Sequence, residues 1–474
     1  MSTRPFWLAG SAVTGDTELT VLNPYTGETA GTAAVPSPAQ IELAVAAADS
    51  VAPRAAALPA HVRAEALAHV SRRLGERAEE IAALITAESA KPITWARVEV
   101  ARAVSVFRWA AEEARRDSGD LQRLDTDPAA TGRIALIRRV PKGPVLGISP
   151  FNFPLNLVAH KIAPAIAVGA PIILKPAPAT PLSALVLGEI LAETDLPPGM
   201  VSVLPMPNER AAPLITDPRL PVISFTGGQF GWELQRLAPH KHITLELGGN
   251  AAAVVLPDAD LDWAARRIAV FGNNHAGQVC VGVQRVIVDD LVYDDFVAEL
   301  VRRVEALRTG DPADPATEVG PLIDEGAAIR VESWVREAVE AGATLLTGGG
   351  RDGVTVAPAV LADVPEDARV VRDEVFGPVL VVQRTKGVDE AFAKVNAGDY
   401  GLQTGVFTRD LQVAFRAHRE LEVGGVVIGD VPSFRADQMP YGGVKKSGVG
   451  KEGLAAAMAD LTYERVLVLT GVQL

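Results

Sequence analysis

An alternation of two kinds of segment, beginning at Pro144, constrains the fold more than any other feature. Short apolar runs such as PVLGI, PIILK and VISF are separated by longer segments with helical periodicity, such as PLSALVLGEILAE. Short apolar runs predict strands buried on both faces, and the helical segments between them predict parallel crossovers. The alternation restarts after Gly249 with AAAVVL. The sequence therefore predicts two α/β lobes in series, joined near Gly248 and Gly249.

The length supports this division, because 474 residues exceed what one hydrophobic core usually holds. The N-terminal part is predicted to be helical, with Ser37 and Pro38 as cap and first turn, followed by helices over 61–74 and 93–116. Strand-like segments at 131–140 and 461–469 lie outside both alternations. Such strands must pair with other strands, and this pairing could take place across a subunit interface.

Composition excludes several classes of function. The net charge of −13 and the scattered basic residues argue against nucleic acid as a partner. One cysteine excludes an internal disulfide framework, and the seven histidines lack metal-binding spacing, so we expect no metal. The start of the chain has no apolar signal region, and the most apolar stretch, 145–173, is interrupted by polar residues and prolines. We expect a cytoplasmic protein without a membrane span.

The single cysteine, Cys280, is a candidate nucleophile, and Glu246 is a candidate base. A lone cysteine is more often a small buried hydrophobic residue. Here it follows a polar stretch, Asn273 to His275, and then Gly277 and Gln278, and a thiolate needs such access and hydrogen-bond donors. Glu246 ends a predicted strand before two glycines, where it is either a base for water or an ordinary strand-end carboxylate.

Other motifs suggest an oxyanion donor and a phosphate site. Asn152, in SPFNFPLN, either donates to an oxyanion or caps the following helix. The turn FTGG follows a predicted strand and precedes a helix, so its backbone N–H groups suit a pyrophosphate. Gly448, Gly450 and Gly453 satisfy GxGxxG, but the preceding segment is a loop, so we do not interpret them as a dinucleotide fingerprint.

Seven motifs taken together resemble the aldehyde dehydrogenase superfamily over essentially the whole chain: PFNFP, LKPAPATP, FTGG, LELGGN, GQVC, EVFGPV and MPYGGVKKSG. The resemblance implies two doubly wound Rossmann-like α/β domains and a small β oligomerisation arm. We assign 1–119 and 142–247 to the cofactor domain, 248–446 to the catalytic domain, and 120–141 and 447–474 to oligomerisation. The resemblance also implies that the protein is a homodimer or homotetramer.

The resemblance assigns roles to the candidate catalytic residues. Cys280 resembles the nucleophile, Asn152 and the Cys280 backbone N–H resemble the oxyanion hole, and Glu246 resembles the base that activates water. The expected reaction is oxidation of an aldehyde to a carboxylic acid through a thiohemiacetal and a thioester on Cys280, with NAD or NADP accepting hydride.

The matching cofactor positions include two departures from the family pattern. Where relatives that prefer NAD have a ribose-binding glutamate, this chain has Pro178, which makes NADP admissible or preferred. The usual FTGSxxxG turn is FTGGQFG, with Gly228 in place of serine. The predicted cofactor contacts are Pro150, Phe151, Lys175, Ala177, Pro178, Phe225, Gly227, Gly228, Leu247, Glu374 and Phe376.

The positions that line the substrate tunnel in the family are Arg102, His160 and Arg435 here. Cationic and polar groups in an otherwise apolar tunnel favour a small aldehyde with an anionic tail. The alternatives are a solvated helix face for Arg102, a core histidine for His160 and a structural loop arginine for Arg435. The string DVPSFRADQMPYGGVKKSG further resembles the branch with non-phosphorylating glyceraldehyde-3-phosphate, lactaldehyde and phosphonoacetaldehyde dehydrogenases.

Three other functions compete with this interpretation. A CoA-acylating semialdehyde dehydrogenase is the nearest, but such relatives commonly lack a base at the position of Glu246. A non-catalytic binding or structural member of the family has no need of Cys280, Glu246 and Asn152 together. A cysteine hydrolase would bind no nicotinamide cofactor.

Overall fold

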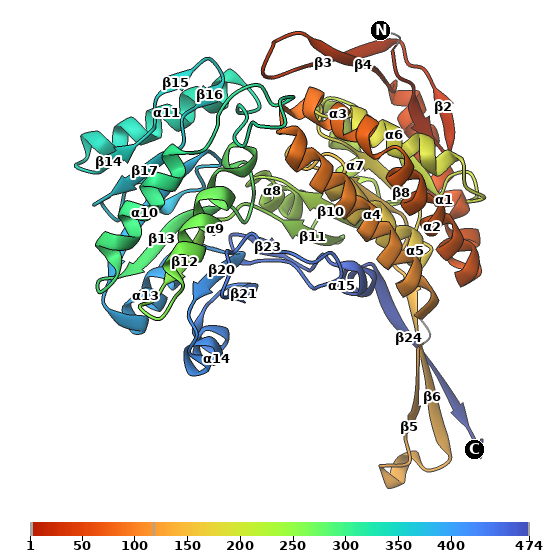
Figure 1. Cartoon of the computed structure of the whole chain (residues 1–474). Coiled ribbons are helices and arrows are strands. Elements are labelled where there is room, and N and C mark those ends of the chain that lie inside the picture. The colour runs from red at the N-terminus through yellow and green to blue at the C-terminus, as the bar shows by residue number, and fades with distance from the viewer. Residues whose placement is uncertain (1–2, 117–118, 473–474) are drawn as a thin grey trace.

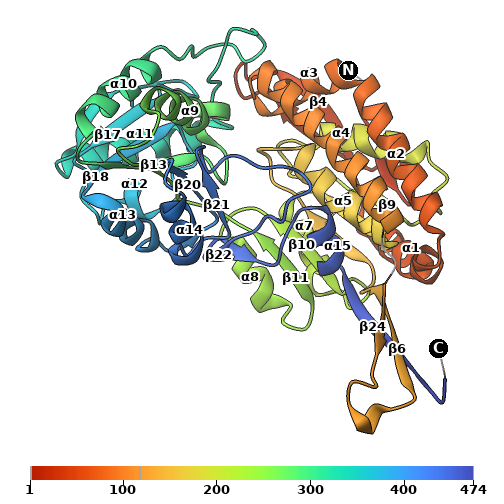
Figure 2. The ribbon, with the colours of Figure 1, turned by 60° about the horizontal axis from the view of Figure 1, so that its bottom comes forward.

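The computed structural model describes residues 3–116 and 119–472. Two α/β lobes lie side by side, and a narrow three-stranded arm projects from one of them (Figures 1 and 2). The first lobe contains the N-terminal helices and one sheet, and the second contains a separate sheet. The mixed α/β fold with parallel sheets, predicted from the alternation of segments, is confirmed.

The sheet of the first lobe has a parallel centre and antiparallel edges. Its order is β2-β1-β9-β8-β7-β10-β11-β23. The five central strands are parallel, whereas β1 pairs antiparallel with β9, and β23 pairs antiparallel with β11. The strands are β1 (Phe6–Leu8), β2 (Ser11–Val13), β7 (Val145–Ile148), β8 (Ile172–Lys175), β9 (Val201–Val203), β10 (Val222–Thr226), β11 (His242–Glu246) and β23 (Gly448–Val449).

Helices cover this sheet and bury one large apolar core with it. They are α1 (Pro38–Ala56), α2 (Ala60–Glu76), α3 (Ala78–Ser89), α4 (Ile93–Arg116), α5 (Asn156–Val168), α6 (Leu182–Ala192), α7 (Asn208–Thr216), α8 (Phe230–Leu237) and α15 (Leu454–Asp460). Ser37 caps α1 through a capping box, as the sequence predicts. The N-terminal strands were not predicted, and neither was the hairpin of β3 (Thr17–Leu22) and β4 (Thr29–Val35).

The second lobe has a sheet in the order β14-β17-β18-β13-β12-β20-β21, in which only β14 is antiparallel to its neighbour. Its strands are β12 (Ala251–Val255), β13 (Val283–Asp289), β14 (Thr344–Thr347), β17 (Ala359–Ala362), β18 (Val379–Thr385), β20 (Gln403–Phe407) and β21 (Gly425–Ile428). Its helices are α9 (Leu261–Asn273), α10 (Tyr293–Glu305), α11 (Glu325–Glu340), α12 (Arg369–Arg372), α13 (Gly387–Asn396) and α14 (Leu411–Glu420). Smaller elements are η1 (Pro128–Ala130), η2 (Asn274–Gly277), β15 (Arg351–Asp352), β16 (Thr355–Val356), β19 (Tyr400–Gly401) and β22 (Val444–Lys445).

The arm consists of β5 (Asp120–Arg123), β6 (Arg133–Pro141) and β24 (Thr462–Thr470) (Figure 1). The two strand segments that lay outside the predicted lobes pair with each other, from Thr462 opposite Pro141 to Thr470 opposite Arg133. Their ladder is therefore satisfied within one chain, and no interface is needed to pair β6 with β24. Because β24 is an edge strand of this sheet, its outer backbone groups are available to another strand.

Residues 448–460, which belong to the segment assigned to oligomerisation, lie against the first lobe. β23 pairs with β11, and α15 packs on α4 and α5. Gly448 has a φ of +135°, and a Cβ there would lie 2.0 Å from the carbonyl oxygen of Leu245. The glycine thus allows close approach of two strands, which is a structural role and not that of a dinucleotide fingerprint.

No helix in the described ranges has the length and apolar character needed to cross a bilayer.

Candidate active site

The carboxyl ends of four parallel strands form the edge where the candidate residues gather. Strands β7, β8, β10 and β11 run in the same direction and end at this edge. Ligands of doubly wound sheets bind outside the carboxyl ends of the strands. The loops that follow carry Asn152 and Gly227, whereas Lys175 is the last residue of β8 and Glu246 the last residue of β11.

Cys280 lies beyond a left-handed turn in the second lobe. After α9 the backbone adopts φ values of 50° at His275, 53° at Ala276 and 71° at Gly277. The left-handed region costs a residue other than glycine about 1–2 kcal/mol, so the buried surroundings must hold this turn in place. At Gly277 a Cβ would lie 2.1 Å from the carbonyl oxygen of Gly377, so a side chain does not fit there. The turn leads to Cys280, which is partly exposed.

Asn152 is buried and points at the backbone next to the thiol. Its Nδ2 donates to the carbonyl oxygen of Gln278 at 2.8 Å. Helix α5 begins after Leu155 and has no side-chain cap, so the alternative that Asn152 caps this helix is wrong. The Gln278 side chain accepts a bond from the Ile323 N–H at 3.0 Å, which fixes the segment that orients Asn152. One N–H of the carboxamide is thus used for orientation, and the other remains for a second acceptor.

The hydroxyl of Tyr441 contacts both Cys280 and Glu246, and the thiol and the carboxylate also lie close enough to interact directly. The Cys280 Sγ lies 3.1 Å from the Tyr441 Oη, and this hydroxyl donates to the Glu246 Oε1 at 3.3 Å. Burial and then the nearby Glu452 carboxylate raise the pKa of Glu246 to about 7. Burial, with the Glu246 carboxylate adding to it, raises the pKa of the Cys280 thiol well above its ordinary range. The resting pair is therefore a neutral thiol beside a carboxylate that binds a proton more readily than an ordinary carboxylate does.

Glu452 joins two buried cations behind Glu246. Lys161 Nζ donates to Thr226 Oγ1 at 2.7 Å and lies 3.5 Å from Glu452 Oε1. Arg435 Nη2 bonds Glu452 Oε2 at 3.1 Å, and its guanidinium carbon lies 3.9 Å from the centre of the Tyr441 ring. Burial opposes ionisation of Glu452, but Lys161 and Arg435 outweigh it and hold the pKa of Glu452 at about 2.

Asp437 connects the two other predicted substrate residues. Arg102 Nη2 lies 2.9 Å from the Asp437 Oδ1, and His160 Nε2 lies 3.4 Å from the same oxygen. Burial and the charge of Arg435 lower the pKa of His160 to about 4, so His160 is neutral at pH 7. The structure thus brings Arg102 and His160 together, and it places Arg435 close enough to His160 to influence its charge.

Sequence reasoning missed the carboxylates that balance these cations and the tyrosine at the thiol: Asp437, Glu452 and Tyr441. One signal was available for this cluster, because Lys161 lies in a mostly apolar helix whose residues are all buried. A buried lysine requires a partner, and the partner here is Glu452.

The side chains predicted to contact the cofactor suit a dinucleotide. Lys175 ends β8 and bonds Asn208 Oδ1, and burial lowers its pKa to about 8, which leaves it largely cationic at pH 7. The nearby Glu209 carboxylate favours the charged form of Lys175. Gly228 is exposed, and a Cβ there would meet nothing within 4 Å, so the turn before α8 is open. This set provides a cation and an open turn before a helix for phosphate, with no carboxylate at Pro178.

The nicotinamide end of the predicted site is formed by both lobes. Glu374, in the loop before β18, accepts the Gly249 N–H at 2.9 Å, and its carboxylate lies against Gly248. The rings of Phe151 and Phe376 meet edge to face at 5.9 Å. A carboxylate suits ribose hydroxyls, and Glu374 is held at the junction of the lobes, where β11 leads into β12. The remaining predicted contacts lie next to residues already placed. Pro150 precedes Phe151, Ala177 precedes Pro178, Phe225 belongs to β10, and Leu247 follows Glu246.

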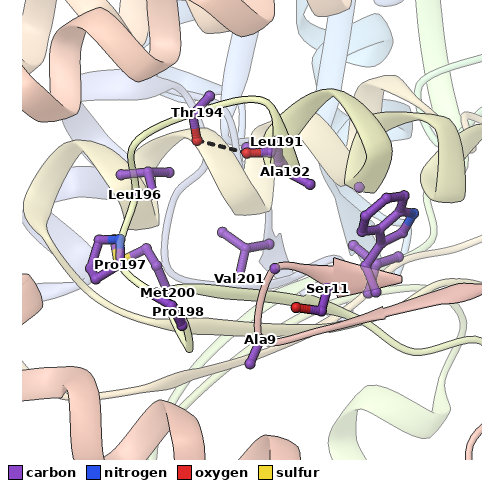
Figure 3. A pocket seen from close by; sticks show the side chains of 14 residues that line it. Ala9, Ser11, Leu191, Ala192, Thr194, Leu196, Pro197, Pro198, Met200 and Val201 are labelled. Atoms are coloured by element: carbon purple, nitrogen blue, oxygen red, sulfur yellow. Dashed lines mark hydrogen bonds between the residues drawn. The ribbon is translucent and has the colours of Figure 1, made fainter. Parts of the chain in front are cut away.

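A separate cavity of about 210 Å³ lies away from this edge (Figure 3). It is formed by β1, β9 and the segment after α6, where Thr194 bonds the carbonyl oxygen of Leu191. Its lining contains no ionisable side chain, so it does not provide acid–base chemistry or charge recognition.

The fold and this set of side chains define an oxidoreductase that acts on aldehydes with NAD or NADP. The chain belongs to the aldehyde dehydrogenase family, whose model matches residues 11–467.

Known proteins resemble the chain over its full length. It is 42% identical to a 3-sulfolactaldehyde dehydrogenase of Priestia aryabhattai over 467 residues, or 97% of this chain and 98% of that protein. The structure of aldehyde dehydrogenase 21 from Physcomitrella patens, in complex with the reaction product succinate, matches with a TM-score of 0.98 at 42% identity, covering 100% and 99% of the two chains. The NADP-dependent glyceraldehyde-3-phosphate dehydrogenase of Bacillus halodurans, complexed with NADP, matches with a TM-score of 0.96 at 36% identity over 100% of both chains.

Proposed function

We propose that this enzyme oxidises a short aldehyde with an anionic group at its far end, and that it releases the carboxylic acid. Cys280 is the nucleophile, Asn152 and the Cys280 backbone N–H stabilise the oxyanion, and Glu246 activates water. Arg102 and Arg435 bind the anionic end. NADP is accepted as well as NAD, because Pro178 places no carboxylate beside the ribose and Lys175 supplies a cation.

The observation that carries the choice of substrate is a donor on Arg435 without an acceptor. Within the described residues the Arg435 Nε is buried and has no hydrogen-bond partner, although Nη2 is bonded to Glu452. A buried donor without a partner costs about 1–3 kcal/mol, so the site favours a ligand that supplies an acceptor. Arg435 stacks on Tyr441, and the Tyr441 hydroxyl contacts the thiol. In a ligand that reacts with the thiol, the group that accepts from Arg435 therefore lies within a few bonds of the reacting carbon.

The known relatives support an anionic end. The names of the matched proteins refer to a sulfonated aldehyde, to succinate as a product and to a phosphorylated aldehyde. These molecules share a short chain with a strong anion at one end. The positive charges of Arg102 and Arg435 are partly balanced by Asp437 and Glu452, and Lys161 adds a third cation, so these five side chains keep an excess of positive charge.

The proposed chemistry divides between the two lobes. The Cys280 thiolate adds to the aldehyde carbon, and the Asn152 amide donates to the oxygen as it becomes negative. When bound, the nicotinamide ring accepts a hydride equivalent, which leaves the substrate as a thioester on Cys280. Glu246, in its ionised form, removes a proton from water, and the hydroxide formed attacks the thioester and releases the acid and the thiol.

The test of the substrate class uses aldehydes of equal length that carry a sulfonate, a carboxylate or no charge. In Arg435→Gln, the loss of a charge-assisted bond is expected to lower kcat/KM on the charged aldehydes about 10- to 100-fold and to change it little on the neutral one. Arg102→Gln is expected to act in the same direction. NADPH and NADH formation are both followed, without CoA.

The matched control for that test is Arg219→Gln, which removes a paired arginine of the first lobe that bonds Glu42 at 2.6 Å. It should leave the preference for charged aldehydes unchanged. If the wild type prefers the neutral aldehyde, or if Arg435→Gln lowers all substrates equally, the arginines are structural and the proposed substrate class is wrong.

Asn152→Ala tests the oxyanion role. Removing one oxyanion donor costs on the order of a hundredfold to a thousandfold in kcat, and we expect a loss in this range with little change in KM. The measurement is steady-state NADPH formation, with the affinity for NADPH measured by fluorescence as a check on the cofactor lobe. A decrease of less than tenfold would show that Asn152 only braces the Gln278 segment.

We further propose that the arm joins subunits into a homodimer or homotetramer. Val466, Leu467 and Val468 in β24 are 55%, 55% and 49% exposed, and a continuous apolar edge strand is a site for pairing with another chain. Introducing lysine at both Val466 and Val468 is expected to lower the particle mass in sedimentation velocity by at least half. Leu291→Lys, at a position 82% exposed in the second lobe, is the control and should leave the mass unchanged.

A further inference from the structure

The Tyr441 hydroxyl contacts both reacting groups, Cys280 and Glu246, but the mechanism proposed above gives it no role. This hydroxyl lies 3.1 Å from the Cys280 Sγ and 3.3 Å from the Glu246 Oε1, and the side chain is buried. Tyr441 belongs to the loop after β21, far in sequence from both partners. A ring without the hydroxyl would fill the same space, so packing alone does not explain the oxygen.

We propose that the Tyr441 hydroxyl transfers the proton of the resting Cys280 thiol to Glu246, and so generates the nucleophile. The S–H bond of Cys280 breaks and its proton binds the Tyr441 oxygen, while the Tyr441 O–H bond breaks and its proton binds Glu246 Oε1. The products are a thiolate, a neutral tyrosine and a neutral carboxylic acid. No electron is gained or lost. This inference rests on the proposed roles of Cys280 and Glu246.

The surroundings keep Tyr441 in the form that this transfer needs. A phenol hydroxyl has one donor and two acceptor positions, so it can accept from the thiol and donate to the carboxylate at the same time. Burial, and then the neighbouring Cys280 and Glu246, raise the pKa of Tyr441 well above its ordinary range. The hydroxyl therefore remains protonated near neutral pH. The Arg435 guanidinium over its ring stabilises any negative charge that develops on the oxygen during the transfer.

The transfer also explains how a thiol with a raised pKa reacts near neutral pH. Loss of the proton to water would leave two anions, the thiolate and the Glu246 carboxylate, next to each other, and this is unfavourable. Transfer to Glu246 leaves only one anion, and the pKa of about 7 makes Glu246 a better acceptor than an ordinary carboxylate. The charged and titratable groups that act on the pair are Glu452, Arg435, Lys161 and Glu374.

The test is the alkylation of Cys280 by iodoacetamide in the free enzyme at pH values from 5.5 to about 9, chosen to bracket the Glu246 pKa of about 7. Because Cys280 is the only cysteine of the chain, the labelling rate reports this thiol alone and requires neither aldehyde nor cofactor. The variants are Tyr441→Phe, which removes only the hydroxyl, and Glu246→Gln. Tyr25→Phe, at a tyrosine 40% exposed, is the matched control.

In the wild type and in Tyr25→Phe, the rate is expected to rise with pH through an inflection near 7, because Glu246 must be ionised to accept the proton. In Glu246→Gln this inflection should disappear. In Tyr441→Phe it should also disappear, since ionised Glu246 then only repels a thiolate, and the rate at pH 8 should be lower than in the wild type by on the order of tenfold or more. Thermal unfolding and NADPH affinity verify that each variant is folded.

An inflection near pH 7 that persists at full rate in Tyr441→Phe but is lost in Glu246→Gln would mean that the proton passes directly from Cys280 to Glu246, and the inference would be wrong. Failure of the proposed function has a different signature. If a Cys280→Ala enzyme still oxidises aldehydes, Cys280 is not the nucleophile, and this conclusion requires no alkylation measurement.

Discussion

Cys280→Ala is expected to lower aldehyde oxidation by at least about 10⁴-fold, the largest effect of any single substitution in this chain, because loss of a covalent nucleophile removes the reaction path itself. No other cysteine is present to replace it. The change removes only the sulfur of a partly exposed residue, so the fold and the affinity for NADPH should be retained. The measurements are steady-state and single-turnover NADPH formation, with cofactor affinity measured by fluorescence.

Residual turnover within about tenfold of the wild type would be incompatible with covalent catalysis by this thiol. It would require an aldehyde hydrate as the species that is oxidised, with Glu246 as the base. The absence of both cofactor binding and oxidation in the wild type, with retained hydrolysis of activated esters, would instead support the alternative of a cysteine hydrolase.

The second large decrease in activity is expected for Glu246→Gln, because this substitution slows the hydrolysis of the thioester. General base catalysis contributes about 10²- to 10⁴-fold, so steady-state turnover should decrease in this range. The thioester forms before the base is needed for water. The variant should therefore produce about one equivalent of NADPH per subunit and then stop, with an acyl adduct on Cys280 that mass spectrometry detects after acid quenching. This single turnover should be slower than in the wild type, because the substitution also removes the proposed acceptor of the thiol proton.

The pH dependence of the wild type follows from the same residue. The pKa of Glu246 is raised to about 7, and the base acts only when ionised. Turnover limited by hydrolysis should thus decrease as the pH falls through about 7 and reach a plateau above it, and Glu246→Gln should lose this dependence. Full steady-state turnover in the variant would exclude Glu246 as the base. A wild type that turns over only when CoA is added would support the acyl-transfer alternative.

The sequence was sufficient for most of the fold, and its omissions share one cause. Strands such as β7, β8 and β10 are buried on both faces and appear as continuous apolar runs, so their pattern is visible without a partner. Strands β1 and β2 have three residues each, and β3 is largely exposed, so neither length nor apolar character distinguished them. Their strand conformation depends on the neighbours that they pair with.

The residues of the candidate site also divide into those that the sequence indicated and those that it did not. Motifs indicated Cys280, Glu246 and Asn152, because the reaction requires these residue types and they lie beside glycines and prolines that shape the turns. No motif indicated which groups set their charges. Tyr441 lies 161 residues from Cys280 and 195 from Glu246, and Asp437 lies 335 residues from Arg102.

Local patterns along the chain were enough to predict the alternation of strands and helices, the division into two α/β lobes and the residue types available for thiol chemistry, since periodicity and turn residues are local properties of a chain. Three features appear only in the folded chain: Arg435 is paired with Glu452, His160 is neutral, and the Tyr441 hydroxyl contacts both the thiol and its base. Charge pairing and pKa values depend on burial and on distances between atoms that lie far apart in the chain, and packing of the two lobes sets both.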